Sequence, residues 1–445
     1  MSNQNKNSAS TKGFTLIEVL VGIVILALIS LSFYSLINFT LKTIWEAKAK
    51  ITATQLANQK IEMARNLSYQ AVGTQNGIPF GTIPNTETVL RNNIEYIVNT
   101  QVIYIDDEFD GVLDGEPNDT LNTDYKKVRV EVSWNYRLQH KPVILITNIV
   151  PPGLESSVGG GTLKILVYNA SGQPVSQANV FIQNTDLDPN ININTLTDDQ
   201  GFVILPGSPE SIENYQITAT KNNYSTDQTR NSTTELPSPE KPHASIFEDQ
   251  TTNISFSIDL LSNLNLVIQN ENEINLSNIE LNIQGEKTIG FDAEELPVYK
   301  FNQNYFSNYL GQIILNNIEW DTYNFIMPTN AVYNISETVP IQPLNLLQNT
   351  TTAVLITLVP KAQHSALIIV KDINEQPLPD AQVHFYNYSK GLDQTIITDE
   401  SGQAFFTPWQ NTTSTLDIIK TGFENFLDEC EIDGYHIESI VLTEQ

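Results

Sequence analysis

The feature that most constrains this chain is a long apolar segment close to its N-terminus. Residues 14–41 read FTLIEVLVGIVILALISLSFYSLINFTL, and Glu18 is the single formal charge among them. As an α-helix, about 28 residues rising about 1.5 Å each give about 42 Å, which exceeds the about 30 Å of a bilayer's hydrocarbon core. The segment is also longer than the apolar part of a secretory signal peptide. We therefore expect a membrane-spanning helix over 14–41.

Glu18 is the anomaly of this apolar segment. A carboxylate in a membrane span costs at least about 2.5–3.5 kcal/mol when it is left unpaired, so such residues usually have a partner or a function. Neither Lys nor Arg occurs in 14–41. The partner is therefore expected in another chain, in lipid or water, or at a new amino terminus made by cleavage after Gly13.

The residues around Glu18 resemble the class III signal of type IV prepilins and pseudopilins. That signal has a basic leader ending in Gly, an aromatic first mature residue and Glu as the fifth, and Gly13, Phe14 and Glu18 match it. The resemblance implies that a prepilin peptidase/methyltransferase removes the leader 1–13 and methylates Phe14. It also implies that an inner-membrane assembly platform adds the helix to a filament of other pilin or pseudopilin subunits.

In such a filament, the Phe14 ammonium of one subunit can neutralise Glu18 of its neighbour and fix the axial register. The simpler alternative is a plain anchor, in which Glu18 reaches toward the membrane interface.

The helical pattern continues after the apolar segment. Apolar residues recur at spacings near three and four, as at Ile44, Ile51, Leu56 and Ile61, and no Pro or Gly occurs before Gly73. We expect one helix over 14–67, with an amphipathic second half. Alternating, β-branched segments then predict a small antiparallel β head over 68–150.

The predicted head contains a densely acidic connection. Asp106, Glu108, Asp110 and Asp114 take the first, third, fifth and ninth places of a loop similar to that of an EF-hand. Pro117 occupies the place of the expected bidentate Glu, and no helices are predicted on either side, so an EF-hand proper is excluded. A Ca²⁺ site and a solvated acidic loop both stay open. Some pseudopilins hold Ca²⁺ in a loop of the head, which favours the metal.

A repeated pattern follows the linker 151–161. The motif Gln-Pro-x3-Ala-x-Val and the later motif Thr-Asp-x2-Gly occur in two copies, at Gln173, Pro174, Ala178, Val180, Thr197, Asp198 and Gly201, and again at Gln376, Pro377, Ala381, Val383, Thr398, Asp399 and Gly402. A degenerate middle copy has Ile279, Leu281 and Gly311. We expect three β-sandwiches, over 162–262, 263–361 and 364–445. They resemble carboxypeptidase regulatory-like, transthyretin-like domains, which implies spacer, adhesive or sugar-contacting modules without catalytic residues.

Charge and motif content exclude several classes of function. The formal net charge of -28 repels a phosphate backbone, so we expect no nucleic-acid binding by this subunit. The five His residues form no pair at metal-ligand spacing, and the single Cys430 has only His436 near it in sequence and no second thiol. No phosphate-binding or hydrolase motif occurs, so we expect no enzyme and no cofactor apart from the Ca²⁺ considered above. Trp320, Tyr323 and Trp409 are candidates for sugar stacking, although core positions are the more ordinary explanation.

The sequence as a whole predicts an α+β fold, with a long transmembrane helix packed on a small antiparallel β head and followed by tandem all-β sandwiches. The function we expect is a pilin-like or pseudopilin-like structural subunit, a minor or tip component. It would sit in the cytoplasmic membrane, with its N-terminus in the cytoplasm and its bulk outside, and reach the cell surface when assembled. The alternative is a membrane-tethered protein that binds a carbohydrate or protein ligand and uses the prepilin signal only for display.

Overall fold

The structure is a computed structural model that describes residues 15–107, 109, 111, 116–119, 123–134, 142–152, 159–407 and 409–445. The chain divides into two units, Met1–Val158 and Gly159–Gln445. One long apolar helix is followed by many, mostly antiparallel sheets, which confirms the predicted fold class.

The first unit begins with helix α1 (Leu16–Arg65), which is unbroken over its length. Thr15 caps its N-terminus: the Glu18 amide donates to Thr15 Oγ1 at 3.3 Å, and the Glu18 carboxylate accepts from the Thr15 amide at 2.9 Å. This reciprocal pair is a capping box, which satisfies amide groups that the first helical turn leaves without partners. The helix ends at Asn66, just short of the predicted end at residue 67.

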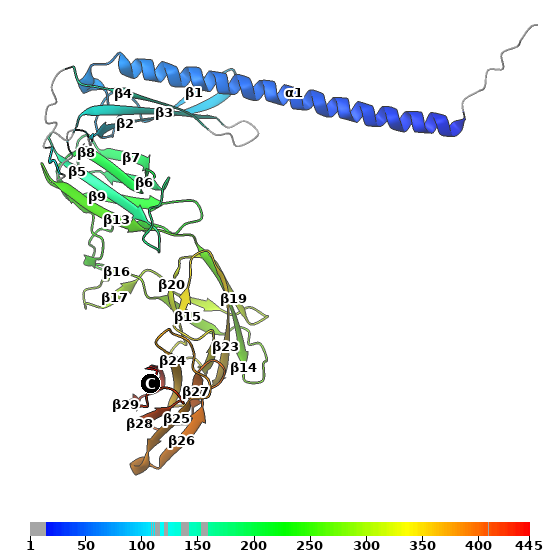
Figure 1. Ribbon diagram of the computed structural model, residues 1–445, viewed down its shortest axis with the longest axis vertical. Coiled ribbons are helices and arrows are strands. Elements are labelled where there is room, and N and C mark those ends of the chain that lie inside the picture. The colour runs from blue at the N-terminus through cyan, green and yellow to red at the C-terminus, as the bar shows by residue number, and fades with distance from the viewer. Residues whose placement is uncertain are drawn as a thin grey trace, which may run out of the picture. The chain divides into compact units, whose positions relative to one another are not determined.

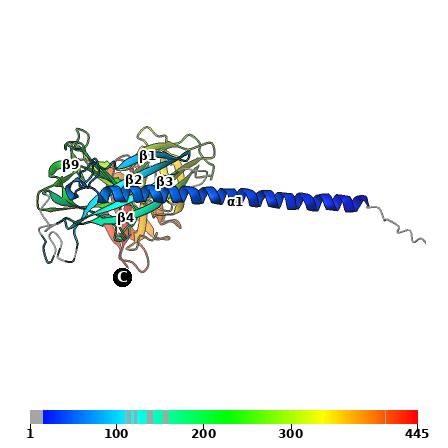
Figure 2. The same ribbon diagram turned by 90° about the horizontal axis from the view of Figure 1, so that it is seen from above.

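A four-stranded antiparallel sheet of order β1-β2-β3-β4 packs on the second half of α1 (Figures 1 and 2). The strands are β1 (Thr86–Arg91), β2 (Ile94–Ile105), β3 (Tyr125–Trp134) and β4 (Val143–Ile149). Small side chains dominate the buried stripe of the helix, which is made of Ala49, Ala53, Leu56, Ala57, Ile61 and Ala64. The predicted inner face was partly wrong, because Ile44 and Ile51 are 46% and 58% exposed. Alanines let the sheet approach the helix backbone closely, whereas the Ile44 and Ile51 side chains point away from it.

The second unit contains three two-sheet β-sandwiches. The first is built from β5 (Gly161–Tyr168), β6 (Asn179–Asn184), β7 (Ile191–Leu196), β8 (Phe202–Ser208), β9 (Ser211–Thr220), β10 (Asp227–Gln228), β12 (Ala244–Ile246) and β13 (Thr251–Ser257). The second is built from β14 (Ser262–Asn270), β15 (Glu280–Gly285), β18 (Asn302–Phe306), β19 (Gln312–Ile318), β20 (Asp321–Ile326), β21 (Tyr333–Val339), β22 (Leu344–Leu346) and β23 (Thr351–Pro360). The third is built from β24 (Ser365–Asp372), β25 (Gln382–Asn387), β26 (Leu392–Ile397), β27 (Gln403–Phe406), β28 (Thr412–Ile419), β29 (Phe426–Ile432) and β30 (Tyr435–Leu442).

The three sandwiches share one strand plan. In each, the first strand pairs in parallel with the last, as β5 with β13, β14 with β23 and β24 with β30. A hydroxyl accepts from the backbone amide that opens the second strand: Thr197 from Ala178 at 2.9 Å, Thr398 from Ala381 at 2.8 Å and Ser307 from Ile279 at 2.9 Å. In the middle copy, Ser307 therefore takes the place that Thr197 has in the first copy. The degenerate sequence motif did not reveal this equivalence.

Additional contacts join consecutive sandwiches. Strand β11 (Ser238–Pro239), which follows the first sandwich's β10, pairs with β16 (Thr288–Phe291) of the next copy, and β17 (Pro297–Tyr299) completes a small sheet. The second and third sandwiches share a core, in which Leu367 and Ile369 pack with residues of the second. The Gln403 side-chain amide also exchanges two hydrogen bonds with the Thr338 backbone, at 2.9 and 3.0 Å.

Candidate functional sites

The first candidate site is the start of α1. Gly13 and Phe14 lie outside the described residues, and Glu18 lies in the first helical turn. The Glu18 carboxylate accepts from the Thr15 amide and from Thr15 Oγ1, both at 2.9 Å. The expectation that its partner must lie outside the chain was therefore incomplete. Both donors are neutral, however, and within the described part of the chain Glu18 has no ion pair.

The first half of α1 presents apolar side chains to its surroundings. All residues from 16 to 45 are exposed within the chain, including Leu16 at 86% and Phe39 at 68%. The helix is long and apolar enough to cross a membrane by length and composition. A surface this apolar is stable only against lipid or other apolar helices, because contact with water costs about 25 cal/mol per Å².

The second candidate is the acidic connection between β2 and β3. Of its four predicted ligands, Glu108, Asp110 and Asp114 lie outside the described residues, while Asp106 lies directly after β2. The ladder pairs Ile105 with Tyr125, and the Asp107 amide donates to the Asp124 carboxylate. The sheet therefore gathers Asp106, Asp107 and Asp124 at one end of the head, and the metal prediction stays untested.

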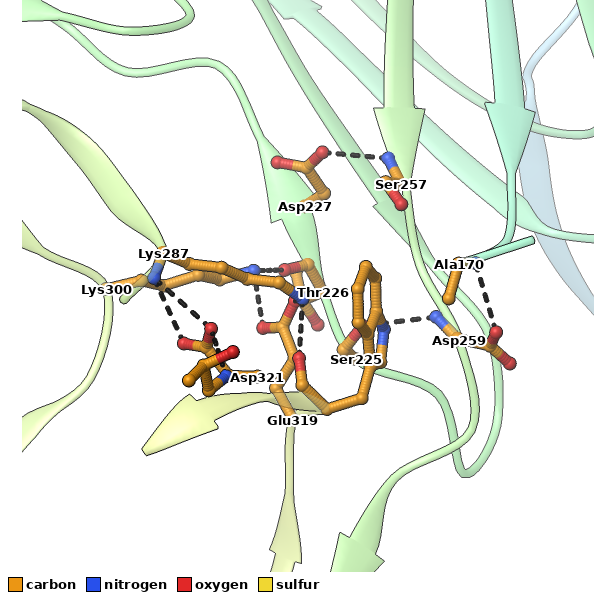
Figure 3. Close-up of polar contacts among 12 residues, drawn as sticks. Ala170, Ser225, Thr226, Asp227, Ser257, Asp259, Lys287, Lys300, Glu319 and Asp321 are labelled. Atoms are coloured by element: carbon orange, nitrogen blue, oxygen red, sulfur yellow. Dashed lines mark hydrogen bonds and ion pairs between the residues drawn. The ribbon is translucent and has the colours of Figure 1, made fainter. Parts of the chain in front are cut away.

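The third candidate is a groove of about 510 Å³ between the first and second sandwiches. Glu319 is one of its lining residues, and its two carboxylate oxygens accept from Lys287 Nζ at 2.8 Å and from Lys300 Nζ at 2.6 Å (Figure 3). Lys300 also donates to the Thr226 carbonyl of the first sandwich at 2.8 Å. One carboxylate thus holds two lysines at the junction, and one of those lysines reaches across it.

Burial shapes the electrostatics of this groove. Removal from water lowers the pKa of Lys287, and the Glu319 carboxylate opposes that effect. Burial likewise raises the pKa of Asp321, which is lowered in turn by hydrogen bonds from the Lys287 and Thr322 amides. The Lys287 ammonium also lies 3.0 Å from the centre of the Trp320 ring and donates to the Trp320 carbonyl at 2.6 Å. The groove therefore has a surface of mixed charge, in which lysines are paired with carboxylates.

The aromatic residues suggested for sugar stacking turn out to be unavailable or covered. Tyr323 is fully buried and Trp409 is 4% exposed, so both are core residues. Lys287 covers one face of the Trp320 ring. Stacking of a sugar on Tyr323 or Trp409 is therefore excluded.

The structure also gathers three groups that the sequence left apart. Cys430, His436 and Glu438 each place one potential ligand atom within 4.8 Å of the others. Sequence spacing alone missed this cluster because β29 and β30 belong to different sheets. The signal that could have found it is a Cys and a His-x-Glu pair on either side of the turn at Asp433 and Gly434.

Comparison with known proteins supports the start of the chain most directly. A family model described as "Prokaryotic N-terminal methylation motif" matches residues 9–34. That segment contains Gly13, Phe14 and Glu18. No curated protein sequence matches the chain. The motif and the apolar helix together support membrane anchoring and a prepilin-like start. The resemblance of the repeats to carboxypeptidase regulatory-like domains stays a prediction.

Several solved structures share distant similarity with the chain. The Bacillus anthracis TIE protein is 17% identical, with 72% of this chain and 59% of that protein covered and a TM-score of 0.19. A minor pilin of Streptococcus agalactiae is 13% identical, with 45% and 97% covered and a TM-score of 0.21. The major pilin subunit of Bacillus cereus is 8% identical, with 64% and 100% covered and a TM-score of 0.17. The chain spans less than two thirds of the first protein, and TM-scores this low carry no functional argument.

Proposed function

We propose that the chain is a pilin-like structural subunit, a minor or tip component of a type IV pilus or a type II secretion-like filament. The observation that carries this proposal is the methylation motif over 9–34, which overlaps the start of a helix whose residues 16–45 are all exposed within the chain. A helix of this kind needs an apolar environment, and a filament core of like helices supplies one after the membrane. The large second unit, Gly159–Gln445, supports a minor role, because so bulky a subunit is poorly suited to a closely repeated shaft.

The test of this proposal is mass spectrometry of the full chain, produced with and without a prepilin peptidase/methyltransferase. We expect the enzyme to remove residues 1–13 and to leave one added methyl group on Phe14. Cells that lack the enzyme provide the control and should keep the leader. A leader that is retained in the presence of an active enzyme, with a known prepilin processed beside it, would rule out the pilin pathway.

The alternative function is a membrane-tethered binding protein, and the groove at Glu319 is the observation that favours it. Paired lysines and carboxylates around a volume of about 510 Å³ suit a polar ligand that carries both donors and acceptors. A glycan and peptide array probed with the full chain tests this function. A Glu319→Gln variant should lose any ligand that binds in the groove. Equal binding by the variant would place the ligand elsewhere.

Calcium in the acidic connection is a separate proposal. Asp106, Asp107 and Asp124 meet at one end of the head, and oxygen donors of this kind suit Ca²⁺. Thermal unfolding in Ca²⁺ and in a calcium chelator tests it. A higher Tm in Ca²⁺ that an Asp106→Asn variant loses would support the site, and identical curves would leave a solvated acidic loop.

A further inference from the structure

The end of the third sandwich brings together a thiol, an imidazole and a carboxylate. Cys430 lies on β29, in the sheet of order β26-β25-β28-β29, and His436 and Glu438 lie on β30, in the sheet of order β27-β24-β30. Side chains alternate along a strand, so His436 and Glu438 share a face of β30 with Ile440 and Leu442, which are 6% and 2% exposed. Cys430 packs in the same core cluster as those two residues. The three polar groups therefore lie at the edge of the space between the two sheets, where the His436 and Glu438 side chains are 35% and 39% exposed.

Their spacing suits a single ion. One ligand atom from each of the three residues lies within 4.8 Å of the other two, and His436 Nε2 is 2.7 Å from Glu438 Oε2. Zn²⁺ is bound by Cys sulfur at about 2.3 Å and by His nitrogen and carboxylate oxygen at about 2.0–2.2 Å, in tetrahedral geometry. Binding would require side-chain movements that bring these three donors to such distances, and the fourth position would then be open to water.

The turn between the two strands is fixed by hydrogen bonds. Gly434 has a φ of 82°, and its amide donates to His364 Nδ1 at 3.0 Å. The Gly434 carbonyl accepts from the Ser365 amide at 3.0 Å. The backbone that connects Cys430 to His436 is thus held in place without any help from the three candidate ligands, as a preorganised site requires.

A cation at this place has to displace the thiol proton. Burial, and then the Glu438 and Asp428 carboxylates, raise the pKa of the Cys430 thiol to about 11. A divalent cation reverses the balance: it neutralises the carboxylate and binds sulfur as thiolate, and the thiol proton leaves to solvent.

We propose that Cys430, His436 and Glu438 form a Zn²⁺ site that ties the two sheets of the third sandwich together. The ion would bridge β29 and β30, which belong to different sheets, close to the C-terminus. Because the ligands come from both sheets, bound Zn²⁺ would stabilise this sandwich against separation of its layers. The site is independent of the N-terminal helix and of the proposed filament role.

The test is titration of the full chain, in detergent micelles and stripped of metal, with Co²⁺ as a spectroscopic substitute for Zn²⁺. We expect a thiolate-to-cobalt charge-transfer band that saturates at one equivalent and disappears when Zn²⁺ is added. Cys430 is the single cysteine of the chain, so this band reports on that residue alone. Co²⁺ bound to the acidic connection of the head would give no such band.

Cys430→Ala should abolish the band. His436→Gln should weaken metal affinity by more than the about 10–100-fold that loss of an outer-shell partner costs. His384→Gln is the matched control, because His384 Nε2 lies 2.9 Å from Asp393 in a His–carboxylate pair on β25 and β26. This variant should bind the metal like the parent chain.

A second readout is the alkylation rate of the thiol, which can be followed in the parent chain first. Zn²⁺ should slow alkylation of Cys430 in the parent chain and leave the rate nearly unchanged in His436→Gln. Absence of the cobalt band from the folded parent chain, or an alkylation rate that Zn²⁺ does not change, would overturn the proposal. So would full Zn²⁺ protection of the thiol in His436→Gln.

Discussion

Thr15 Oγ1 lies 2.9 Å from Glu18 Oε2, so the carboxylate that stands out in the apolar segment also caps its own helix. Capping requires an acceptor oxygen at this position, whereas pairing with the amino terminus of a neighbouring subunit requires a negative charge. The two roles of Glu18 can therefore be separated by substitutions that keep one property and remove the other.

Glu18→Gln should keep the cap and lose the charge, and Glu18→Ala should lose both. If charge pairing sets the register, both variants should insert into the membrane and both should fail to enter filaments. Losing the cap in Glu18→Ala should cost an additional ~1 kcal/mol of helix stability. Membrane fractionation and immunoblotting of sheared filaments measure the two outcomes. Normal incorporation of Glu18→Gln would contradict charge pairing and leave capping as the role of this residue.

Glu319→Gln should weaken the junction between the first two sandwiches. The substitution leaves the Lys287 and Lys300 ammonium groups, whose side chains are 25% and 23% exposed, without their shared counter-charge. We expect the free energy of unfolding to fall by about 1–3 kcal/mol, because a neutral amide replaces a carboxylate that accepts hydrogen bonds from two ammonium groups. Hydrogen exchange of β15 and β20 under increasing urea measures it.

The control for Glu319 is a pair of similar geometry on the surface. Glu62 and Arg65 lie 2.8 Å apart, with side chains that are 61% and 52% exposed. Glu62→Gln should change stability by less than about 0.5 kcal/mol, because exposed pairs contribute little. Equal effects of the two substitutions would show that Glu319 adds nothing beyond a surface contact.

Local sequence patterns were sufficient to predict the regular parts of the fold. The apolar segment and the spacing after it predict one helix, and α1 follows it from Leu16 to Arg65. The repeated turn motifs mark corresponding positions: the Gly201, Gly311 and Gly402 carbonyls all accept from the first strand of their own sandwich. Periodicity and turn chemistry are local properties, which is why one sequence suffices to read them.

Contacts between distant segments could not be predicted in this way. No repeating sequence spacing marks the residues that make these contacts. Examples are the pairing of β11 with β16, the two lysines around Glu319 and the cluster at Cys430. The capping role of Glu18 was overlooked for a different reason. The Thr-x-x-Glu spacing of a capping box is present in the sequence, but the apolar residues around it are typical of a membrane span rather than of a capped helix start.

Gly290→Ala should detach β11 from β16. Gly290 has a φ of 145°, and a Cβ added there would overlap the Ser238 carbonyl of the facing strand. We expect faster exchange of the Glu240 amide, which donates to the Ile289 carbonyl at 2.9 Å next to this pair. Gly172→Ala is the control, because Gly172 has a φ of 72° and no atom within 4 Å of an added Cβ. Gly172→Ala should lower the free energy of unfolding only by the about 1–2 kcal/mol of backbone strain, and the exchange rate of the Glu240 amide should not change.

Lys126 should make the stability of the head depend on alkaline pH. Its side chain is buried on β3, donates to the Tyr69 and Val72 carbonyls at 2.7 and 2.6 Å, and has its pKa lowered by burial to about 8. The unfolded lysine titrates near about 10.4. Between these values the unfolded chain binds more protons than the folded one, so the free energy of unfolding should rise with pH, by up to about 1.4 kcal/mol per unit.

This rise should begin near pH 8 and continue until the tyrosines ionise. Burial raises the pKa of Tyr104, so unfolded tyrosine, which ionises near about 10, reverses the trend at higher pH. Urea unfolding at a series of pH values measures the slope. Hydrogen exchange of β2 and β3, corrected for intrinsic rates, serves as the readout. Lys126→Met should abolish the slope. The Lys127 side chain points to the other face of β3, so Lys127→Met should keep the slope. A slope that survives in Lys126→Met would assign the pH dependence to a different group.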